Sequence, residues 1–274
     1  MSELGRNATA HRISVPGLAE PVKLSWAALS DRGRRRSGNE DSYVVAPPLF
    51  AVADGMGGHS AGDLASAAVV ERLAESITGD FGTIAQLEAG LAAATDDIIE
   101  IAGDSEIGVG TTVTGAVLVL VDDQPYFAVF NIGDSRVYAF ERNELVQVTT
   151  DHSVVQELVD AGALTKDEAE HHPDSNIITR AVGFGAIPIA DYRMVPLRSG
   201  LRLLICSDGL TKEIGDERLR LHLAAGLSSA ETAGALVDAA LAAGGRDNVT
   251  VVVVDVVEAP VVADLDDTAP RGIR

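Results

Sequence analysis

Two runs rich in β-branched residues constrain most strongly what this chain can fold into. They are Val113–Val121 and Val249–Val257. Each is far shorter than the roughly 18–20 apolar residues that a membrane span needs, and Val prefers extended backbone. We therefore expect buried strands at both places. Shorter apolar or alternating runs predict further strands at 22–26, 49–53, 126–132, 136–141, 145–148 and 201–206.

Helices are predicted between these strands. Apolar residues recur at steps of three and four over 84–101, a spacing typical of an amphipathic helix, and Gly103 marks its end. Thr165–Glu168 and Ser228–Glu231 match the capping box that opens a helix. Because strands and helices do not alternate strictly, the order favours a largely antiparallel β core over a doubly wound parallel sheet. Helices are also expected over 61–76 and 154–160.

The domain organisation follows from length and composition. The chain has 274 residues, and we expect one domain over 22–257, an irregular extension at 1–21 and an acidic, disordered tail at 258–274. No stretch resembles a secretory signal or a membrane span. The lone cysteine, Cys206, excludes an intramolecular disulfide and favours a reducing compartment. A cytoplasmic monomer is expected.

The chain is strongly acidic, with 21 Lys and Arg against 41 Asp and Glu, a net charge of −20 and a pI of about 4.5. A protein that binds nucleic-acid phosphates or an anionic membrane usually carries a basic excess. Neither partner is therefore expected. Hydrophobic residues make up 46% of the chain, so disorder does not explain the charge.

Four aspartates stand at the ends of apolar strands, next to Gly or Asn: Asp54, Asp134, Asp208 and Asp247. Each one alone also fits an ordinary turn after a strand. Together they indicate an all-oxygen metal site, because a carboxylate beside a buried strand is costly unless a cation compensates it. Without the Cys and His clusters that zinc prefers, the donor set favours Mg²⁺ or Mn²⁺. Two such ions would activate a water for hydrolysis of an anionic ester, most naturally a phosphate ester.

One basic segment interrupts this acidic chain. Four arginines lie in the loop at 32–36, directly before Glu40 and Asp41. Guanidinium groups bind phosphate oxygens as a bidentate fork, so the loop is a candidate phosphate clamp. The alternative is a solvated basic turn. Glu40 and Asp41 either hold metal-bound waters or are ordinary surface acids.

Eight segments of the chain form a recognisable series. They are SDRGRRRSGNED (30–41), AVADGMGGHSAG (51–62), GVGTTVTGAVL (108–118), NIGDSRVYAF (131–140), TTDHSVVQELVDAGALT (149–165), NIITRAVG (176–183), LLICSDGL (203–210) and GGRDNVTVVVVDV (244–256). In this order they resemble the metal-dependent Ser/Thr protein phosphatases of type 2C (PPM), in their bacterial form, over nearly all of 24–256. The resemblance implies an α+β fold, a four-layer α/β/β/α sandwich with two central antiparallel β-sheets flanked by helix pairs.

The resemblance implies metal ligands at individual positions. Asp54 resembles the carboxylate that bridges two Mn²⁺ or Mg²⁺ ions, and the Gly55 carbonyl resembles a ligand of one of them. Asp208 and Asp247 resemble ligands of the other ion. Asp134 and Asp208 resemble ligands of a weaker third metal found in bacterial members.

Other matched positions concern the phosphate group and the flap. Arg36 resembles the phosphate-binding arginine, and Glu40 and Asp41 resemble acids that act through metal-bound water. The segment 150–180 resembles a mobile flap over the third metal, to which Asn176 offers an oxygen.

One position departs from the family pattern. Animal members carry a His two residues after the metal-binding Asp, proposed as the general acid, and here that residue is Met56. His59 and His152 are the candidates for this role, with a structural role as the alternative for His59. Metal-bound water is another source of the proton.

Three functions are compatible with these residues. The preferred one is a phosphoprotein phosphatase that hydrolyses phosphoserine and phosphothreonine by attack of a metal-bridging water or hydroxide. It would reverse Ser/Thr kinase signalling, with kinases and their substrates as partners. The second is a non-catalytic or switch-type regulator of a kinase or sigma-factor pathway. The third is a phosphatase of small phosphomolecules. The first is preferred because every metal-ligand position of the pattern is filled by Asp or Gly.

Overall fold

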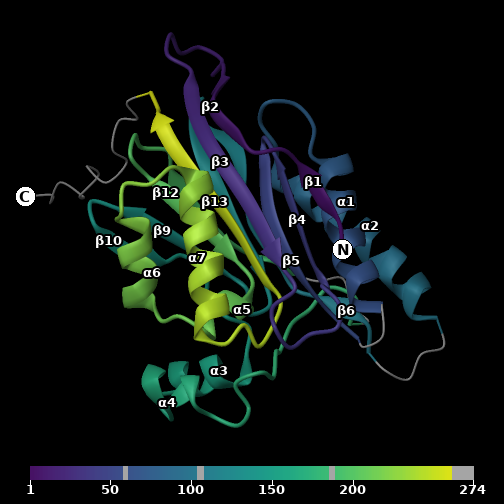
Figure 1. Ribbon diagram of the computed structural model, residues 1–274. Coiled ribbons are helices and arrows are strands. Elements are labelled where there is room, and N and C mark those ends of the chain that lie inside the picture. The colour runs from purple at the N-terminus through teal and green to yellow at the C-terminus, as the bar shows by residue number, and fades with distance from the viewer. Residues whose placement is uncertain (58–60, 104–107, 185–188, 261–274) are drawn as a thin grey trace, which may run out of the picture.

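Two β-sheets pack face to face in the computed structural model, which describes residues 1–57, 61–103, 108–184 and 189–260 (Figure 1). The first sheet has the order β1-β4-β5-β7-β8-β11, with β6 paired to β5, and the second has the order β10-β9-β12-β13-β3-β2. The first sheet contains β1 (Glu3–Gly5), β4 (Asp41–Ala46), β5 (Leu49–Met56), β6 (Gly110–Thr111), β7 (Val113–Val121), β8 (Gln124–Ile132) and β11 (Asp191–Pro196). The second contains β2 (Ala8–Ile13), β3 (Val22–Asp31), β9 (Arg136–Glu141), β10 (Glu144–Gln147), β12 (Arg202–Cys206) and β13 (Val249–Glu258). The named strands pair antiparallel, except β1 with β4, which is parallel.

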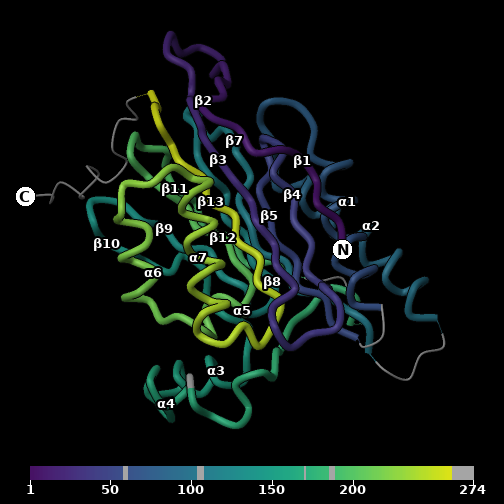
Figure 2. The backbone as a smooth tube through the Cα atoms, in the orientation of Figure 1, coloured from purple at the N-terminus to yellow at the C-terminus, as the bar shows by residue number. Residues whose placement is uncertain are grey.

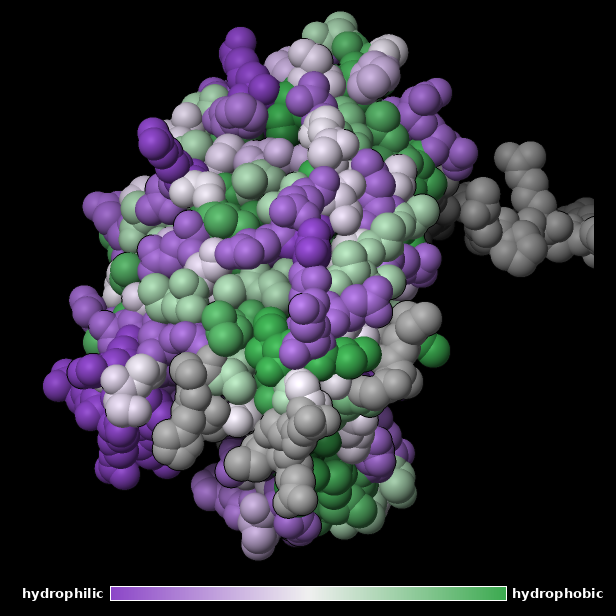
Figure 3. All heavy atoms as spheres, turned by 90° about the vertical axis from the view of Figure 1, so that its right-hand side faces the viewer, coloured by the Kyte–Doolittle hydropathy of each residue, from purple (hydrophilic) through white to green (hydrophobic). Residues whose placement is uncertain are grey.

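Helices cover the outer face of each sheet, so the molecule has four layers (Figures 1 and 2). The first sheet carries α1 (Ala61–Ser76) and α2 (Ile84–Ala102), whose outer side mixes polar and apolar residues (Figure 3). The second sheet carries α6 (Asp216–Leu223) and α7 (Ser229–Ala243), with the short α5 (Asp208–Thr211) after β12. At one end of the sandwich lie α3 (Val154–Asp160) and α4 (Lys166–Glu170). The four-layer α+β sandwich is thus confirmed.

Apolar side chains between the two sheets hold the sandwich together. Phe50 of the first sheet contacts Trp26 of the second edge-to-face, with ring centroids 5.4 Å apart. Phe127 contacts Phe50 in the same manner at 6.4 Å, and all three rings are buried. Separate apolar clusters fill the space between each sheet and its helices. These three apolar clusters fix the strand ends of one sheet relative to those of the other.

Most predicted elements are confirmed to within a few residues. The predicted capping boxes at Thr165–Glu168 and Ser228–Glu231 are both formed by reciprocal hydrogen bonds. The hairpin turns Asp122-Asp123 and Arg142-Asn143 have positive φ at both residues, as type I′ turns require. Besides the two N-terminal strands described below, five elements were not predicted: β4, β6, β11, α5 and α6. Each is short, and most carry several polar residues.

The N-terminal segment 1–21 is irregular only in part: β1 and β2 occupy 3–5 and 8–13, and there the prediction is wrong. β1 pairs with β4 and β2 pairs with β3, so the N-terminal segment covers one edge of each sheet (Figure 1). The backbone makes most of these contacts, and β2 buries only Ile13. A sequence pattern therefore carries little sign of the two strands. The segment also fixes the side chain of Trp26 in β3, because the Arg6 carbonyl accepts a hydrogen bond from the Trp26 Nε1–H at 2.9 Å.

The predicted C-terminal tail is only partly described. β13 extends through Glu258, the first residue of the predicted tail. Residues 261–274 lie outside the described part of the chain, so the disordered tail and the limits of the 22–257 domain stay predictions. No helix in the described ranges is long and apolar enough to cross a membrane.

Deleting residues 1–13 should destabilise the fold and expose its only tryptophan. Trp26 is 4% exposed and loses its hydrogen-bond partner in the deletion, so its fluorescence should shift to longer wavelength. The loss of buried Ile13 alone should lower the free energy of unfolding by about 1.5–3 kcal/mol. Urea titration with fluorescence detection measures both effects. The exposed Arg12→Ala variant is the control, and an unchanged emission spectrum in the deletion would contradict the prediction.

Candidate active site and metal centre

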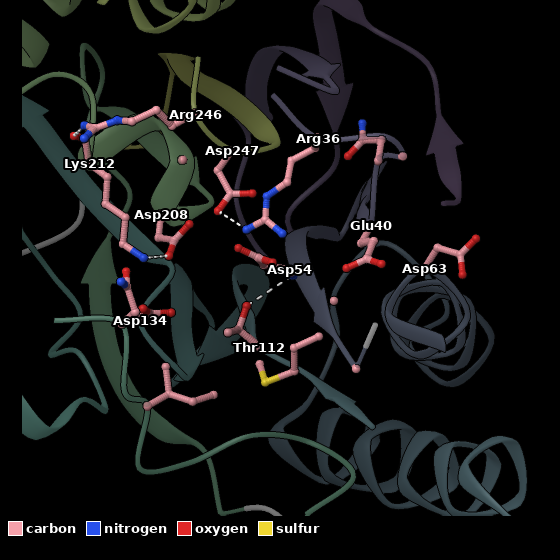
Figure 4. A pocket seen from close by; sticks show the side chains of 18 of the residues that line it. Arg36, Glu40, Asp54, Asp63, Thr112, Asp134, Asp208, Lys212, Arg246 and Asp247 are labelled. Carbon is pink, nitrogen blue, oxygen red and sulfur yellow. Dashed lines mark hydrogen bonds and ion pairs between the residues drawn. The ribbon is translucent and has the colours of Figure 1, made fainter. Parts of the chain in front are cut away.

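A cavity of about 1000 Å³ opens at one end of the sandwich, where loops from both sheets meet (Figure 4). Each of the four strand-end aspartates lines it: Asp54, Asp134, Asp208 and Asp247. The sequence separates these residues by up to 193 positions, yet the topology brings them to one end. Their convergence is as predicted from the sequence, whereas their roles as metal ligands stay a prediction.

Asp54 is held at the end of β5 by its neighbour across the sheet. Its N–H donates to Thr112 Oγ1 at 3.1 Å, and its carbonyl accepts from the Thr112 N–H at 2.9 Å. The next residue is Gly55, where a Cβ would lie 2.0 Å from the Gly62 carbonyl oxygen. Glycine is therefore required here by the close approach of α1 to the strand. This contact fixes the main chain directly after Asp54.

Asp41 lies directly opposite Asp54 in the β4–β5 ladder, but it does not line the cavity. It is completely buried, and its Oδ2 accepts hydrogen bonds from Ser207 Oγ at 2.8 Å and Thr250 Oγ1 at 2.6 Å. Its Oδ1 has no hydrogen-bond partner in the described protein. Asp41 thus ties the first sheet to β12 and β13 of the second. Glu40, the neighbouring residue for which the same role was predicted, does line the cavity.

Asp208 opens α5 just after β12, and Asp134 lies on the same side of the cavity (Figure 4). Lys212, one helical turn later, forms an ion pair with Asp208 Oδ2. Oδ1 of Asp208 is buried and has no hydrogen-bond partner among the described residues. An unpartnered buried carboxylate oxygen requires explanation, and a cation bound in the cavity would supply one.

Arg36 reaches into the cavity from the arginine-rich loop. Its Nη2 donates to Asp247 Oδ2 at 2.7 Å, and about half of its side chain (52%) is exposed. This loop is shaped by Asn248, whose Nδ2 donates to the carbonyls of Arg32 and Gly38 and whose Oδ1 accepts from the Glu40 N–H. Arg36 can therefore meet an anion at the mouth while Asp247 holds its orientation.

The carboxylates of the site are poised to accept positive charge. Burial raises the pKa of Asp41 to about 7 against the hydrogen bonds from Thr250 and Ser207. Burial, with the charge of Asp208, also raises the pKa of Asp134 to about 7, although Lys212 opposes the shift. The pKa of Asp54 is raised well above its ordinary value, first by burial and then by the charges of the other carboxylates. A bound divalent cation would remove this repulsion.

The donor chemistry fits a hard divalent metal. The aspartates and the Gly55 carbonyl offer only oxygen, the preference of Mg²⁺ and Mn²⁺. In the described ranges, no three Asp, Glu, His or Cys side chains are gathered tightly enough to enclose an ion by themselves. Lys212 and Arg36 instead pair with Asp208 and Asp247. Together with Asp54 and the Gly55 carbonyl, these two aspartates would hold the two core ions, and bound waters would complete the shells.

The remaining candidate residues, including the possible proton donors His59 and His152, lie in different places. Met56 and Asn176 line the cavity, whereas His152 does not. His152 is buried, its Nδ1 accepts from the Gly133 N–H at 3.1 Å, and its Nε2 lies 3.2 Å from Asp191 Oδ2. It therefore holds the backbone just before Asp134. His59 lies outside the described residues.

Several residues of the site were not singled out from the sequence. Lys212 follows Asp208 by four positions, the spacing of a helical ion pair, so that pairing was detectable. Asn248 stands beside Asp247 in the RDNVT segment, but nothing in the sequence showed that its amide would clamp a loop more than 200 residues away. Asp63, Glu213 and Arg246 also line the cavity, and no local pattern marked them.

Comparison with solved structures identifies the class of fold. A crystal structure of the Mycobacterium tuberculosis serine/threonine phosphatase PstP/Ppp superposes with a TM-score of 0.76 at 41% identity, covering 86% of this chain and 99% of that one. The catalytic domain of PstP in complex with two manganese ions has a TM-score of 0.72 at 39% identity, with the same coverage. The phosphatase MsPP from Mycobacterium smegmatis, in complex with cacodylate, has a TM-score of 0.76 at 33% identity, covering 85% and 98%.

The sequence comparisons agree with this fold. The profile described as protein phosphatase 2C matches residues 34–243, so the chain belongs to the protein phosphatase 2C family. The serine/threonine protein phosphatase PstP of Mycobacterium tuberculosis is 42% identical over 241 residues, which are 86% of this chain and 45% of PstP. This chain therefore spans less than half the length of that relative. The serine/threonine phosphatase stp of Listeria monocytogenes is 36% identical over 239 residues, 82% of this chain and 93% of stp.

The stability of the metal-free protein should fall as pH rises from about 5 to 7. Asp41 and Asp134 keep their protons in the folded state up to about pH 7, whereas the unfolded chain releases them near 3.8. The folded state therefore binds more protons in this window, and each group lowers the free energy of unfolding by up to about 1.4 kcal/mol per pH unit.

Urea unfolding in a chelator at several pH values measures this slope. Saturating Mn²⁺ should flatten it, because bound cations favour the ionised carboxylates, and Asp41→Asn should reduce it without metal. A stability that rises with pH in the chelator would contradict the prediction.

Proposed function

We propose that this chain is a metal-dependent protein phosphatase that hydrolyses phosphoserine and phosphothreonine. The observation that carries the proposal is the cavity in which four aspartates and Arg36 meet, with oxygen donors on one side and a guanidinium at the mouth. Membership of the protein phosphatase 2C family supports it. By this proposal the partners are phosphorylated proteins, including Ser/Thr kinases and their substrates. The protein acts as a monomer in the cytoplasm, a reducing compartment that suits its lone thiol.

The proposed cofactor is Mn²⁺ or Mg²⁺, two ions at the core with a third, weaker ion. The two manganese ions of the PstP catalytic domain support this assignment. Asp54 and the Gly55 carbonyl, with Asp208 and Asp247, would hold the core ions, and Asp134 would serve the third. When bound, such ions activate water at neutral pH and neutralise the phosphoryl oxygens.

The chain's own residues perform the remaining tasks. Arg36 binds two phosphoryl oxygens through its planar fork and orients phosphorus toward the aspartates. Glu40, on the wall of the cavity, accepts hydrogen bonds from waters there. Asp41 acts as a positioning residue, because its bonds to Ser207 and Thr250 fix the strand that faces Asp54. The non-catalytic regulator is not favoured, since the predicted ligand positions are intact and converge.

Hydrolysis of p-nitrophenyl phosphate tests the proposed activity. The purified protein should hydrolyse it with Mn²⁺ and lose the activity in excess chelator. Asp54→Asn should abolish turnover, because the neutral amide cannot hold two cations together. Asp238→Asn, an exposed change on α7, is the matched control and should retain full activity. Full activity of the wild type in chelator would overturn the proposal.

Arg36→Lys should weaken substrate binding while the metal site remains. Lysine keeps the charge but loses the bidentate fork, and a hydrogen bond to a charged group contributes about 1.5–3 kcal/mol. We therefore expect kcat/KM for a phosphopeptide to fall by about tenfold or more, mostly through KM. Steady-state kinetics measure the loss of substrate binding. The Mn²⁺ concentration that gives half-maximal activity reports on the metal site and should not change. An unchanged kcat/KM in this variant would show that Arg36 does not bind the phosphate.

A further inference from the structure

The charges around the cavity are distributed unevenly. Lys212 and Arg246 lie on the side of Asp208 and Asp247, whereas Glu40 and Asp63 lie on the opposite side (Figure 4). One flank of the mouth therefore carries basic side chains among its carboxylates, whereas the charged residues that the structure describes on the other are all carboxylates. Such an arrangement orients a charged ligand.

The basic side continues from Arg246, on the cavity wall, to Arg34 and Arg35 of the neighbouring loop. We call these three arginines the cationic shelf. The shelf is built by contact between two loops. The Arg34 N–H donates to the Gly245 carbonyl at 2.7 Å, and Arg34 Nε donates to the Leu241 carbonyl at 2.8 Å. Arg246 is fixed by Glu213, with Nε 2.9 Å from Oε1. The backbone of both loops is thus held in place at the mouth.

One acidic side chain, Glu213, is embedded in the shelf. It is only 2% exposed, whereas Arg246 is 59% exposed. Burial raises the pKa of Glu213, but hydrogen bonds from Arg246 and the charges of Arg246 and Arg35 outweigh it and leave the pKa below its ordinary value. Glu213 therefore compensates one of the three guanidinium groups. The shelf keeps an excess of positive charge in a chain whose net charge is −20.

Arg35 carries the part of this charge that is available to a ligand. It is exposed, and its side chain has no hydrogen-bond or ion-pair partner among the residues that the structure describes. It stands next to Arg36, and consecutive Cα atoms are about 3.8 Å apart. Its charge also acts on Glu213, which lines the cavity, so Arg35 lies close enough to the mouth to meet a side chain within a few residues of the phosphorylated residue. The structural alternative, a guanidinium that serves only solubility, predicts no effect of Arg35 on substrate choice.

We propose that the cationic shelf binds an Asp or Glu side chain that flanks the phosphorylated residue, so that acidic phosphopeptides are the preferred substrates. This inference rests on the proposed phosphatase function. Arg36 takes the phosphate, while Arg35, with Arg246 beside it, takes the carboxylate. The acidic wall formed by Glu40 and Asp63 disfavours the reversed placement of the same peptide.

Three phosphothreonine peptides of otherwise identical sequence test the shelf. One carries Glu at the positions before the phosphothreonine, one carries Glu after it, and one carries Lys on both sides. The wild type should hydrolyse one of the Glu peptides with a kcat/KM about three- to fivefold above that of the Lys peptide, the range that one or two exposed ion pairs provide. This ratio should shrink at high salt, because exposed charges are screened.

Arg35→Glu should abolish or invert the ratio of Glu-peptide to Lys-peptide kcat/KM. Arg12→Glu makes the same charge change on β2, far from the cavity (Figure 1), and should leave the ratio as in the wild type. Equal kcat/KM values for the three peptides in the wild type would overturn the inference. So would an unchanged ratio in Arg35→Glu.

Failure of the proposed function remains distinguishable from failure of this inference. If the wild type hydrolyses p-nitrophenyl phosphate but shows no preference among the peptides, the proposed phosphatase function stands and the proposed role of the shelf is wrong. If nothing is hydrolysed, fluorescence anisotropy with the same labelled peptides still measures binding. Tighter binding of a Glu peptide that Arg35→Glu abolishes would support the shelf, and equal binding of the three peptides would overturn it.

Discussion

Repulsion between buried carboxylates at one end of the sandwich is the constraint on which the rest of the structure depends. Asp41 and Asp54 face each other across a strand pair, and Asp134, Asp208 and Asp247 surround them. Burial removes the water that would otherwise screen these charges. The protein's own cations compensate only part of the charge, through Lys212 and Arg36. The site is therefore built to take up further positive charge.

The topology explains how such an unfavourable group of charges is held together. The β4–β5 hairpin supplies one pair of carboxylates, and the ends of β8 and β12 and the start of β13 supply the others. The apolar layers between the sheets and helices stabilise these strands, so the site does not need to stabilise itself. Asp41 also makes two hydrogen bonds to the opposite sheet. The ionised Asp41 side chain thus destabilises the metal-free protein, while its two hydrogen bonds connect the two sheets.

Much of the fold and site was predictable from local sequence, and the remainder was not for identifiable reasons. Capping boxes, hairpin turns and valine-rich strands are encoded within a few residues, so helices such as α7 were predicted closely. The strand-end aspartates were detectable because each sits beside Gly or Asn after an apolar run. The strands β1 and β2 were not predicted, because backbone pairing at the sheet edges stabilises them and such pairing leaves no pattern of side chains.

Contacts between distant segments were equally hidden. The amide of Asn248 shapes the loop at 32–38, and Gly55 must be glycine because of a helix that follows it in the chain. Neither constraint has a periodic pattern. Family resemblance supplied roles for single positions such as Arg36, but the pairing of Arg36 with Asp247 became evident only from the geometry.

The position of Cys206 has a consequence for redox chemistry. This sole thiol ends β12, two residues before Asp208, and it is fully buried. Burial raises its pKa to about 12, although the charge of Arg136 opposes the shift. Peroxides attack thiolates, and a buried thiol that stays protonated is a poor target. By the proposed function, phosphate is removed without a sulfur nucleophile, so conditions that oxidise exposed thiolates would leave the proposed chemistry in operation.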